Sequence, residues 1–411
     1  MQTEHNKVTK TKVESTVSEE TRQETDTQKP EKPRVEAGIW TESMLAALVN
    51  GVKGGKWFSL MDKIYAERTL KIAWQRVKKN KGAAGIDRIS IERFEGQAER
   101  YLEELQQQLK TGTYQPQAVK RVNIPKASGG TRPLGIPTVK DRVVQMAIKQ
   151  VVEPIFEHTF SHNSHGFRPG RSCKDALREV DKQLKAGYSW AVDADIKGYF
   201  DNISHTLMMD KIEQQIADKR LLRLLKAYLK QGIMAEGKSW TPTKGTPQGA
   251  VLSPLLANIY LNDLDHQIGA KHHMVRYADD FIILTSSEAE AENALTEVKQ
   301  WMEKHELELH PEKTKITKET EDPDGFDFLG YTFKRGMRLV RKKSQKAMRD
   351  KIRQHTRRSQ GKGIEAIIET LNPILRGWFN YFKQAKREEL RAMDGFVRRR
   401  LRSILRKYQK K

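Results

Sequence analysis

The 411-residue sequence predicts an α+β fold followed by a basic helical domain. Between residues 116 and 333, short strand-like segments alternate with longer helical ones, which is typical of an α+β domain. Beyond residue 333 the periodicity is helical and the composition changes. Residues 334–411 hold 26 Lys plus Arg against 6 Asp plus Glu, a net charge of +20 in a chain whose total is +22. We therefore predict that this segment is a separate domain and that it binds a polyanion.

The N-terminal part divides into two predicted regions. Residues 1–38 are rich in Thr, Glu, Lys and Gln and poor in apolar side chains, so they form a predicted disordered polar tail. Residues 39–115 form a predicted, mostly helical extension, in which the apolar residues between 60 and 77 have spacings that suit a helix.

Cysteine content and hydropathy exclude several classes of protein. Cys173 is the only cysteine, so no internal disulfide or thiolate zinc cluster can form, and a reducing cytoplasm is the predicted location. The sequence has no apolar run of membrane-spanning length and no charged-then-apolar leader. We expect a cytoplasmic protein with no membrane partner.

Two acidic segments in the α+β region predict a catalytic centre. Asp279 and Asp280 stand at the tip of a predicted β-hairpin, because strand-forming residues fill 274–277 and 281–284. In the predicted strand 190–196, alternation places Asp193 and Asp195 together on one face. Carboxylates on such a strand are costly to bury unless cations offset them. The alternative interpretation of the hairpin is an acidic turn that faces water.

The order of several sequence blocks resembles group II intron reverse transcriptases, also called maturases. Asp195 with Phe200 resembles motif A of that family, residues 277–280 resemble motif C, and residues 245–256 resemble motif B. The remaining resemblances are those of residues 81–90 (N-terminal extension), 124–137 and 166–172 (fingers), 326–331 (primer grip) and 376–382 (thumb).

The resemblance implies a right-hand polymerase, with fingers and an antiparallel palm sheet in residues 116–333 and an α-helical thumb or maturase domain in residues 334–411. Its implied reaction is RNA-directed DNA synthesis, in which deoxynucleotides are added to a primer 3′ end. By resemblance, Asp195, Asp279 and Asp280 are the catalytic carboxylates, and together with Ile196 they hold two Mg²⁺ ions, for which Mn²⁺ is a substitute. Asp279 ranks above Asp280 as a ligand, and Asp193 is supporting or structural.

The resemblance also assigns residues to nucleotide and nucleic acid. The residues expected to contact the incoming nucleotide are Lys126, Arg132, Phe200, Gln248 and Lys313. Those expected at the template, primer or RNA are Arg168, Arg171, Gly249, Leu329, Gly330, Arg398, Arg399 and Arg400. Phe200 would exclude a ribose 2′-hydroxyl, with a structural core role as its alternative. Ser253 and Pro254 are expected to open the helix after motif B as N-cap and first residue.

The thumb residues predict helices with one apolar face. Leu390, Met393, Val397, Leu401, Ile404 and Tyr408 recur at three- and four-residue steps, and an earlier helix presents Leu375, Trp378, Phe379 and Phe382. A solvated basic surface is the alternative to RNA contact here.

The resemblance implies four partners: group II intron RNA, a primed RNA template, deoxynucleotides and, for members that insert into DNA, a target DNA. No DNA endonuclease region is expected in this chain. Two alternative functions are an RNA-binding maturase that acts mainly in splicing and a host-recruited reverse transcriptase in defence or repair.

Overall fold

A computed structural model gives the structure of the protein. It describes residues 35–36, 38–52, 54–125, 130–235, 237–357, 359, 361 and 363–409. The predicted disordered tail therefore lies almost wholly outside the described residues. Lys126 lies outside them entirely.

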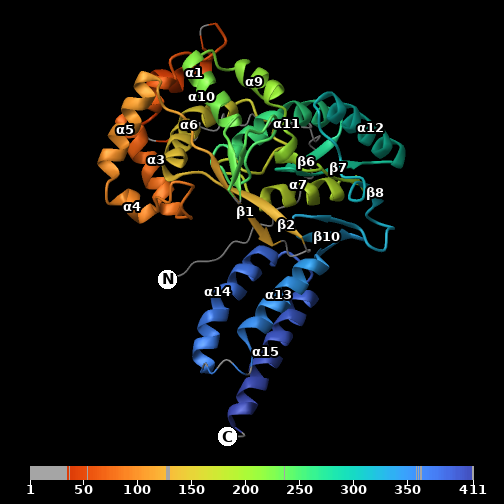
Figure 1. Ribbon diagram of the computed structural model, residues 1–411. Helices are drawn as coiled ribbons and strands as arrows, with labels where there is room; N and C mark the ends of the chain where they lie inside the picture. The colour runs from red at the N-terminus through yellow and green to blue at the C-terminus, as the bar shows by residue number, and fades with distance from the viewer. Residues whose placement is uncertain are drawn as a thin grey trace, which may run out of the picture. The chain divides into compact units, whose positions relative to one another are not determined.

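The N-terminal extension is helical, as the sequence predicts (Figure 1). Its helices are α1 (Glu42–Asn50), α2 (Met61–Ile64), α3 (Glu67–Asn80), α4 (Ile91–Glu95) and α5 (Ala98–Thr111). The expected helical stretch 60–77 is interrupted between α2 and α3. The start of α2 is held in place because the backbone N–H groups of Leu60 and Met61 donate to the Asp218 carboxylate, at 2.8 and 2.9 Å. Asp218 also caps α10 (Lys219–Leu229), so one carboxylate joins the two helix starts.

The first sheet has the strand order β2-β1-β4-β5. Its strands are β1 (Val119–Pro125), β2 (Thr131–Ile136), β4 (Ile233–Ala235) and β5 (Lys238–Trp240). β1 and β2 are antiparallel, whereas β1 and β4 are parallel. The chain then enters α6 (Val139–Glu157), which is buried along most of its length and capped by the Thr138 hydroxyl.

The second sheet, of order β6-β7-β3-β8, carries the acidic residues. Its antiparallel strands are β3 (Trp190–Asp195), β6 (His273–Tyr277), β7 (Asp280–Thr285) and β8 (Lys315–Lys318). The helices of this region are α7 (Cys173–Lys185), α8 (Tyr199–Asn202), α9 (His205–Glu213), α11 (Ser253–Gly269) and α12 (Glu288–Lys304). The predicted α+β class is thereby confirmed.

Both faces of this second sheet are covered. Val192 and Ala194 of β3 belong to the main hydrophobic core, which also includes buried residues of α11 and α12. Ala191, on the opposite face, packs in a second core with Leu177 of α7. The sheet is therefore a rigid, two-sided support, and the strand alternation predicted for residues 190–196 is present.

A small third sheet leads into the C-terminal helices. Its strands are β9 (Phe326–Phe328), β10 (Tyr331–Lys334) and β11 (Met337–Val340), in the order β11-β10-β9. The helices that follow, blue in Figure 1, are α13 (Lys342–His355), α14 (Ile364–Phe382) and α15 (Arg387–Gln409). The predicted domain boundary at residue 333 falls within β10, so the sheet continues past it into the region expected to be helical.

The C-terminal helices pack through the predicted apolar stripe of α15. Met393 and Val397 pack with residues of α13, and Ile404 packs with residues of α14. Phe379 is an exception, because its side chain is 51% exposed rather than buried. Among the described residues, no helix combines the length and apolar character needed to cross a membrane.

Candidate active site

The predicted acidic hairpin is present and tight. Tyr277 pairs with Asp280 across β6 and β7, so Ala278 and Asp279 form a two-residue turn. Ala278 has a φ of +62°, a conformation that L side chains rarely adopt. Such strain persists only where the surroundings hold the backbone in place.

The sheet register brings a third carboxylate to this turn. Asp195, the last residue of β3, lies directly opposite Asp280 on β7. Asp193 lies two residues earlier on the same face, opposite Lys315 of β8. Residues more than 80 positions apart in the sequence thus form one acidic cluster, in which Asp193 and Asp195 share the face that strand alternation predicts.

Burial and mutual repulsion raise the pKa of several of these carboxyls. For Asp280, burial and then the charges of Asp193, Asp195 and Asp279 raise the pKa to about 7. Burial is also the main cause that raises the pKa of Asp193 to about 7. The pKa of Asp279 is raised by burial and by Asp195, while the positive charge of Arg132 opposes the rise. A bound cation would relieve this repulsion.

Two cationic side chains lie near the cluster. The Lys313 ammonium donates a hydrogen bond to the Asp195 carboxylate, and the backbone N–H of His310 donates to the Asp195 carbonyl at 2.8 Å. Arg132 is exposed on β2 and acts electrostatically on Asp279. Two predicted nucleotide-binding residues from separate parts of the chain are thus close to the acidic centre.

The donor set fits a hard divalent cation that retains outside ligands. Within the described residues, no group of three or more His, Cys, Asp or Glu side chains is arranged to enclose a metal ion. Mg²⁺ commonly takes only one or two protein carboxylates and completes its shell with water and substrate phosphates. Paired carboxylates from β3 and the turn suit that mode of binding. The Ile196 side chain is buried, so only its backbone carbonyl could serve as a ligand.

The loop before α11 lies against β2 and α8. The N–H of Gly135 donates to the Gln248 carbonyl at 2.7 Å, and the N–H of Thr246 donates to the Phe200 carbonyl at 2.7 Å. Gly249 has a φ of +105°, and a Cβ there would lie 2.7 Å from the Gly135 carbonyl oxygen. Because the glycine permits this approach, the loop that carries Gln248 is held beside the first sheet.

One helix start differs from the expectation. Helix α11 has Leu252 at its N-cap, with Ser253 as first residue and Pro254 as second. The Ser253 hydroxyl instead bonds the Thr246 hydroxyl and the Pro247 carbonyl, both at 2.8 Å. It closes the preceding loop rather than capping the helix.

Arg168 is buried and engaged within the protein. Its side chain is 4% exposed and forms an ion pair with Glu157 at 2.7 Å. It also donates to the Ser164 carbonyl at 2.9 Å. A template could reach this guanidinium only if those contacts broke, so its template contact stays a prediction. Arg171 donates to the His162 carbonyl at 2.7 Å in the same loop, and its template contact stays a prediction.

The remaining predicted nucleic-acid contacts occupy two places. Leu329 and Gly330 form the turn between β9 and β10, where the Tyr381 hydroxyl donates to the Leu329 carbonyl at 2.7 Å. Arg398 and Arg399 are exposed on α15.

Arg400, by contrast, is half-buried and bonds within the protein, and its RNA contact stays a prediction. It donates to the Thr356 hydroxyl at 3.0 Å and carbonyl at 2.7 Å at the end of α13, which makes it a contact between helices.

Sequence reasoning missed Arg276. This residue is fully buried in β6, two positions before the turn, and binds Asp265 of α11. The available signal was a cation inside an otherwise apolar strand next to the acidic pair, because an unpaired charge is rarely buried.

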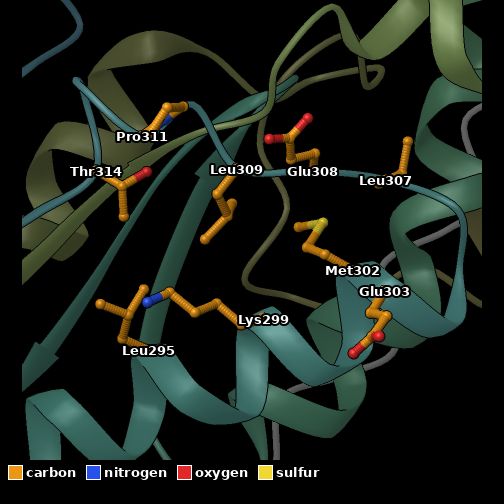
Figure 2. A pocket seen from close by; sticks show the side chains of 9 residues that line it. All are labelled: Leu295, Lys299, Met302, Glu303, Leu307, Glu308, Leu309, Pro311 and Thr314. Carbon is orange, nitrogen blue, oxygen red and sulfur yellow. The ribbon is translucent and has the colours of Figure 1, made fainter.

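A cavity of about 520 Å³ lies between α12 and the segment that follows it (Figure 2). Side chains of α12 face those of the segment 307–314 across it. The lining residues are Leu295, Lys299, Met302, Glu303, Leu307, Glu308, Leu309, Pro311 and Thr314. Asp193, Asp195, Asp279 and Asp280 are not among its lining residues.

Two parts of the chain match known protein families. Residues 124–333 match the family described as "Reverse transcriptase (RNA-dependent DNA polymerase)". This range contains Asp193, Asp195, Asp279 and Asp280. The chain belongs to the reverse transcriptase family. Residues 345–411 match the maturase-specific domain of group II introns, so the resemblance to group II intron reverse transcriptases is confirmed.

Individual relatives agree with that family. Group II intron-encoded protein LtrA of Lactococcus lactis subsp. cremoris is 43% identical over 195 residues, covering 47% of this chain and 32% of that protein. Protein YkfC of Escherichia coli (strain K12) is 33% identical over 308 residues, covering 65% of this chain and 78% of that protein. The uncharacterized 91 kDa protein in the cob intron of Schizosaccharomyces pombe is 38% identical over 197 residues, covering 48% of this chain and 24% of that protein. The chain thus matches about a third of the length of the intron-encoded Lactococcus protein.

Proposed function

We propose that this protein copies RNA into DNA by adding deoxynucleotides to a primer 3′ end. The observation that carries the proposal is the placement of Asp195 directly opposite Asp280, next to the turn that holds Asp279. The match of residues 124–333 to reverse transcriptases supports the same reaction.

In the proposed reaction, the primer 3′-hydroxyl oxygen forms a bond to the α-phosphorus of the nucleotide. The bond from that phosphorus to the pyrophosphate oxygen breaks, and the hydroxyl proton is released. Asp195 and Asp279 would hold Mg²⁺, with Asp280 and the Ile196 carbonyl as further oxygen ligands. When bound, two such ions, or Mn²⁺ in their place, stabilise the negative charge on the phosphates and the attacking oxygen.

Cationic side chains of the chain itself would bind the triphosphate. Arg132 is exposed and close enough to influence Asp279, so it is placed to bind phosphate oxygens. Lys313 would leave Asp195 for the departing pyrophosphate once a metal ion neutralises that carboxylate. The proposed role of Lys126 is the same as that of Arg132.

The loops around the nucleotide would select its sugar and base pair. Phe200 is half-buried, with its ring 5.4 Å from that of Tyr199, which restricts its movement toward the sugar. We assign it the exclusion of a ribose 2′-hydroxyl. Gln248 and Gly249, in the loop that contacts β2, would contact nucleotide and template.

A second proposed function is maturase activity, meaning that the protein binds group II intron RNA and assists its splicing. The match of residues 345–411 to the maturase-specific domain favours it. Exposed cations on α15, such as Arg398 and Arg399, would contact RNA phosphates. The proposed partners are thus intron RNA, a primed RNA template and deoxynucleotides, with target DNA as an addition, and the proposed location is the cytoplasm.

Primer extension with catalytic variants tests the polymerase function. Purified protein, Mg²⁺, deoxynucleotides and a primed RNA template should yield complementary DNA, while Asp195→Asn and Asp279→Asn should abolish it. Asp210→Asn, on the exposed surface of α9, is the matched control and should retain full activity. Absence of product with the unaltered protein, or full activity of Asp279→Asn, would refute the polymerase proposal.

Splicing assistance is measured separately with a group II intron RNA. It should survive Asp195→Asn, because RNA binding does not require the carboxylate. It should weaken when Arg398 and Arg399 are both changed to Ala, and the loss should be largest at low salt and shrink as salt increases, because the variant releases fewer counterions on binding RNA. Unchanged RNA affinity in that double variant would contradict the assignment of α15.

A further inference from the structure

We propose that Arg276 is a positioning residue that holds the turn carrying Asp279 in its metal-binding conformation. The proposal deepens the polymerase function and rests on it for its kinetic consequence. The guanidinium does not reach the substrate in this arrangement, because it is fully buried beneath the turn.

All five N–H donors of the Arg276 guanidinium are used. Nε donates to Asp265 at 2.6 Å, and one Nη2 hydrogen binds the second carboxylate oxygen of the same residue. The other Nη2 hydrogen binds the Ser164 hydroxyl at 2.8 Å. Nη1 donates to the Asn258 side-chain oxygen at 3.1 Å and to the Ala278 carbonyl at 2.7 Å. A guanidinium has five donors, so none is left unsatisfied.

The bond to Ala278 acts directly on Asp279. Peptide units are planar, so a fixed Ala278 carbonyl also fixes the amide nitrogen of Asp279. Ala278 needs such restraint, since its φ of +62° is unfavourable for an alanine. The Arg276 side chain thus stabilises the strained residue directly before the proposed metal ligand.

The same network joins two other parts of the site to the turn. Asp265 and Asn258 both belong to α11, the helix that follows the Gln248 loop. Ser164 belongs to the loop that continues to Gly166, whose carbonyl accepts a bond from Asn258 at 2.8 Å. A Cβ on Gly166 would lie 2.3 Å from the Ala278 nitrogen, so this loop lies directly against the turn. Arg276 therefore fixes the turn relative to both the nucleotide loop and the fingers.

The backbone strengthens this arrangement. The Arg276 N–H donates to the Asn163 carbonyl at 2.8 Å, and the His165 N–H donates to the Arg276 carbonyl at 2.9 Å. These bonds attach the loop to the edge of β6 and do not depend on the side chain. Changing the side chain should consequently loosen the turn while the sheet edge stays paired.

The test replaces Arg276 by Lys, which keeps the positive charge opposite Asp265 but has only three donors and no planar fork. The matched control is Arg338→Lys, because Arg338 is also a buried arginine paired with an aspartate, Asp181, at the third sheet. Ser164→Ala removes a single acceptor and serves as a milder second variant.

Three readouts separate positioning from general stability. Amide hydrogen exchange at residues 277–280 of the metal-free full chain should accelerate about tenfold or more in Arg276→Lys and less in Ser164→Ala. Mn²⁺ affinity, measured by electron paramagnetic resonance, should fall about tenfold. The rate of single-nucleotide addition should fall about 10- to 100-fold, as expected for a catalytic group displaced by a fraction of an ångström to about 1 Å. Affinity for primed template should remain unchanged.

The outcomes are distinguishable. Exchange and Mn²⁺ affinity equal to those of Arg338→Lys, in folded Arg276→Lys protein, would overturn the positioning role. If Arg276→Lys does not fold, unaltered exchange and Mn²⁺ affinity in Ser164→Ala would overturn it instead. If the unaltered protein fails to extend primers but the exchange and Mn²⁺ effects appear, the polymerase function is refuted and the positioning role stands.

Discussion

Replacing Asp280 by Asn should stabilise the metal-free protein at alkaline pH and leave its stability unchanged at acid pH. The structure explains the sign of this effect. Burial and three neighbouring carboxylates raise the pKa of Asp280 from its ordinary value of 3.8 to about 7. A carboxyl with a raised pKa favours the folded state in its protonated form, so stability is highest below pH 4 and falls as pH rises toward 7.

The magnitude follows from the same two values. Each unit of difference between the two pKa values corresponds to about 1.4 kcal/mol of folding free energy. The ionised Asp280 can therefore destabilise the folded protein by at most about 4 kcal/mol above pH 7. Asparagine is neutral but must also be buried, and the repulsion is shared among the four acids. We therefore expect a gain of about 1–3 kcal/mol at pH 8, or roughly 2–5 °C in melting temperature.

The assay is thermal unfolding in a chelator at pH values from 5 to 8, for the unaltered protein, Asp280→Asn and Asp210→Asn. The melting temperatures of the unaltered protein and Asp280→Asn should differ least at pH 5 and diverge further as pH rises toward 7. Asp210→Asn should follow the unaltered protein throughout. Adding Mg²⁺ at pH 8 should raise the melting temperature of the unaltered protein more than that of Asp280→Asn. A difference that does not depend on pH, or a lower melting temperature for Asp280→Asn at pH 8, would refute the reasoning.

Three further predictions concern the loop under the turn and the nucleotide site. Gly166→Ala should lower the single-nucleotide addition rate about 100-fold, because its Cβ would lie 2.3 Å from the Ala278 nitrogen; an unchanged rate would contradict this close approach. Phe200→Val should reduce discrimination against ribonucleotides about tenfold or more, measured as the ratio of kcat/KM for the two nucleotides; an unchanged ratio would favour a purely structural phenylalanine. Burial and then Arg171 lower the pKa of His165 to about 4. Its stabilising contribution is present above pH 6.5 and is lost as pH falls toward 4, so His165→Gln should flatten the acid side of the melting profile, and an identical profile would argue against the assignment.

Local patterns predicted the chemistry of this protein well. Alternation in residues 190–196 placed Asp193 and Asp195 on one face, and strand-forming flanks placed Asp279 in a hairpin turn. These features depend on the geometry of single strands, which repeats every two residues and can be read from neighbouring positions. The apolar stripe of α15 was predictable for the same reason, with the periodicity of a helix.

Long-range contacts decided which charged residues are available. Arg168 and Arg400 have the same chemistry as Arg398, yet Glu157 and Thr356 engage the first two and leave the third on the surface. Neither partner can be inferred from spacing, because it comes from another element of the fold. The exposure of Phe379 similarly depends on which helices pack beside α14.

By itself, the sequence determined the fold class and the acidic residues, which depend on residue type and local periodicity, and the resemblance to a family, which rests on the order of its motif blocks. Only the tertiary structure decided how the acidic turn is held. Arg276 reaches Ser164, 112 residues earlier in the chain, and Asp265 on a neighbouring helix. A buried guanidinium must satisfy all its donors, and the acceptors that satisfy it come together only when α11, the loop 161–166 and β6 pack around it.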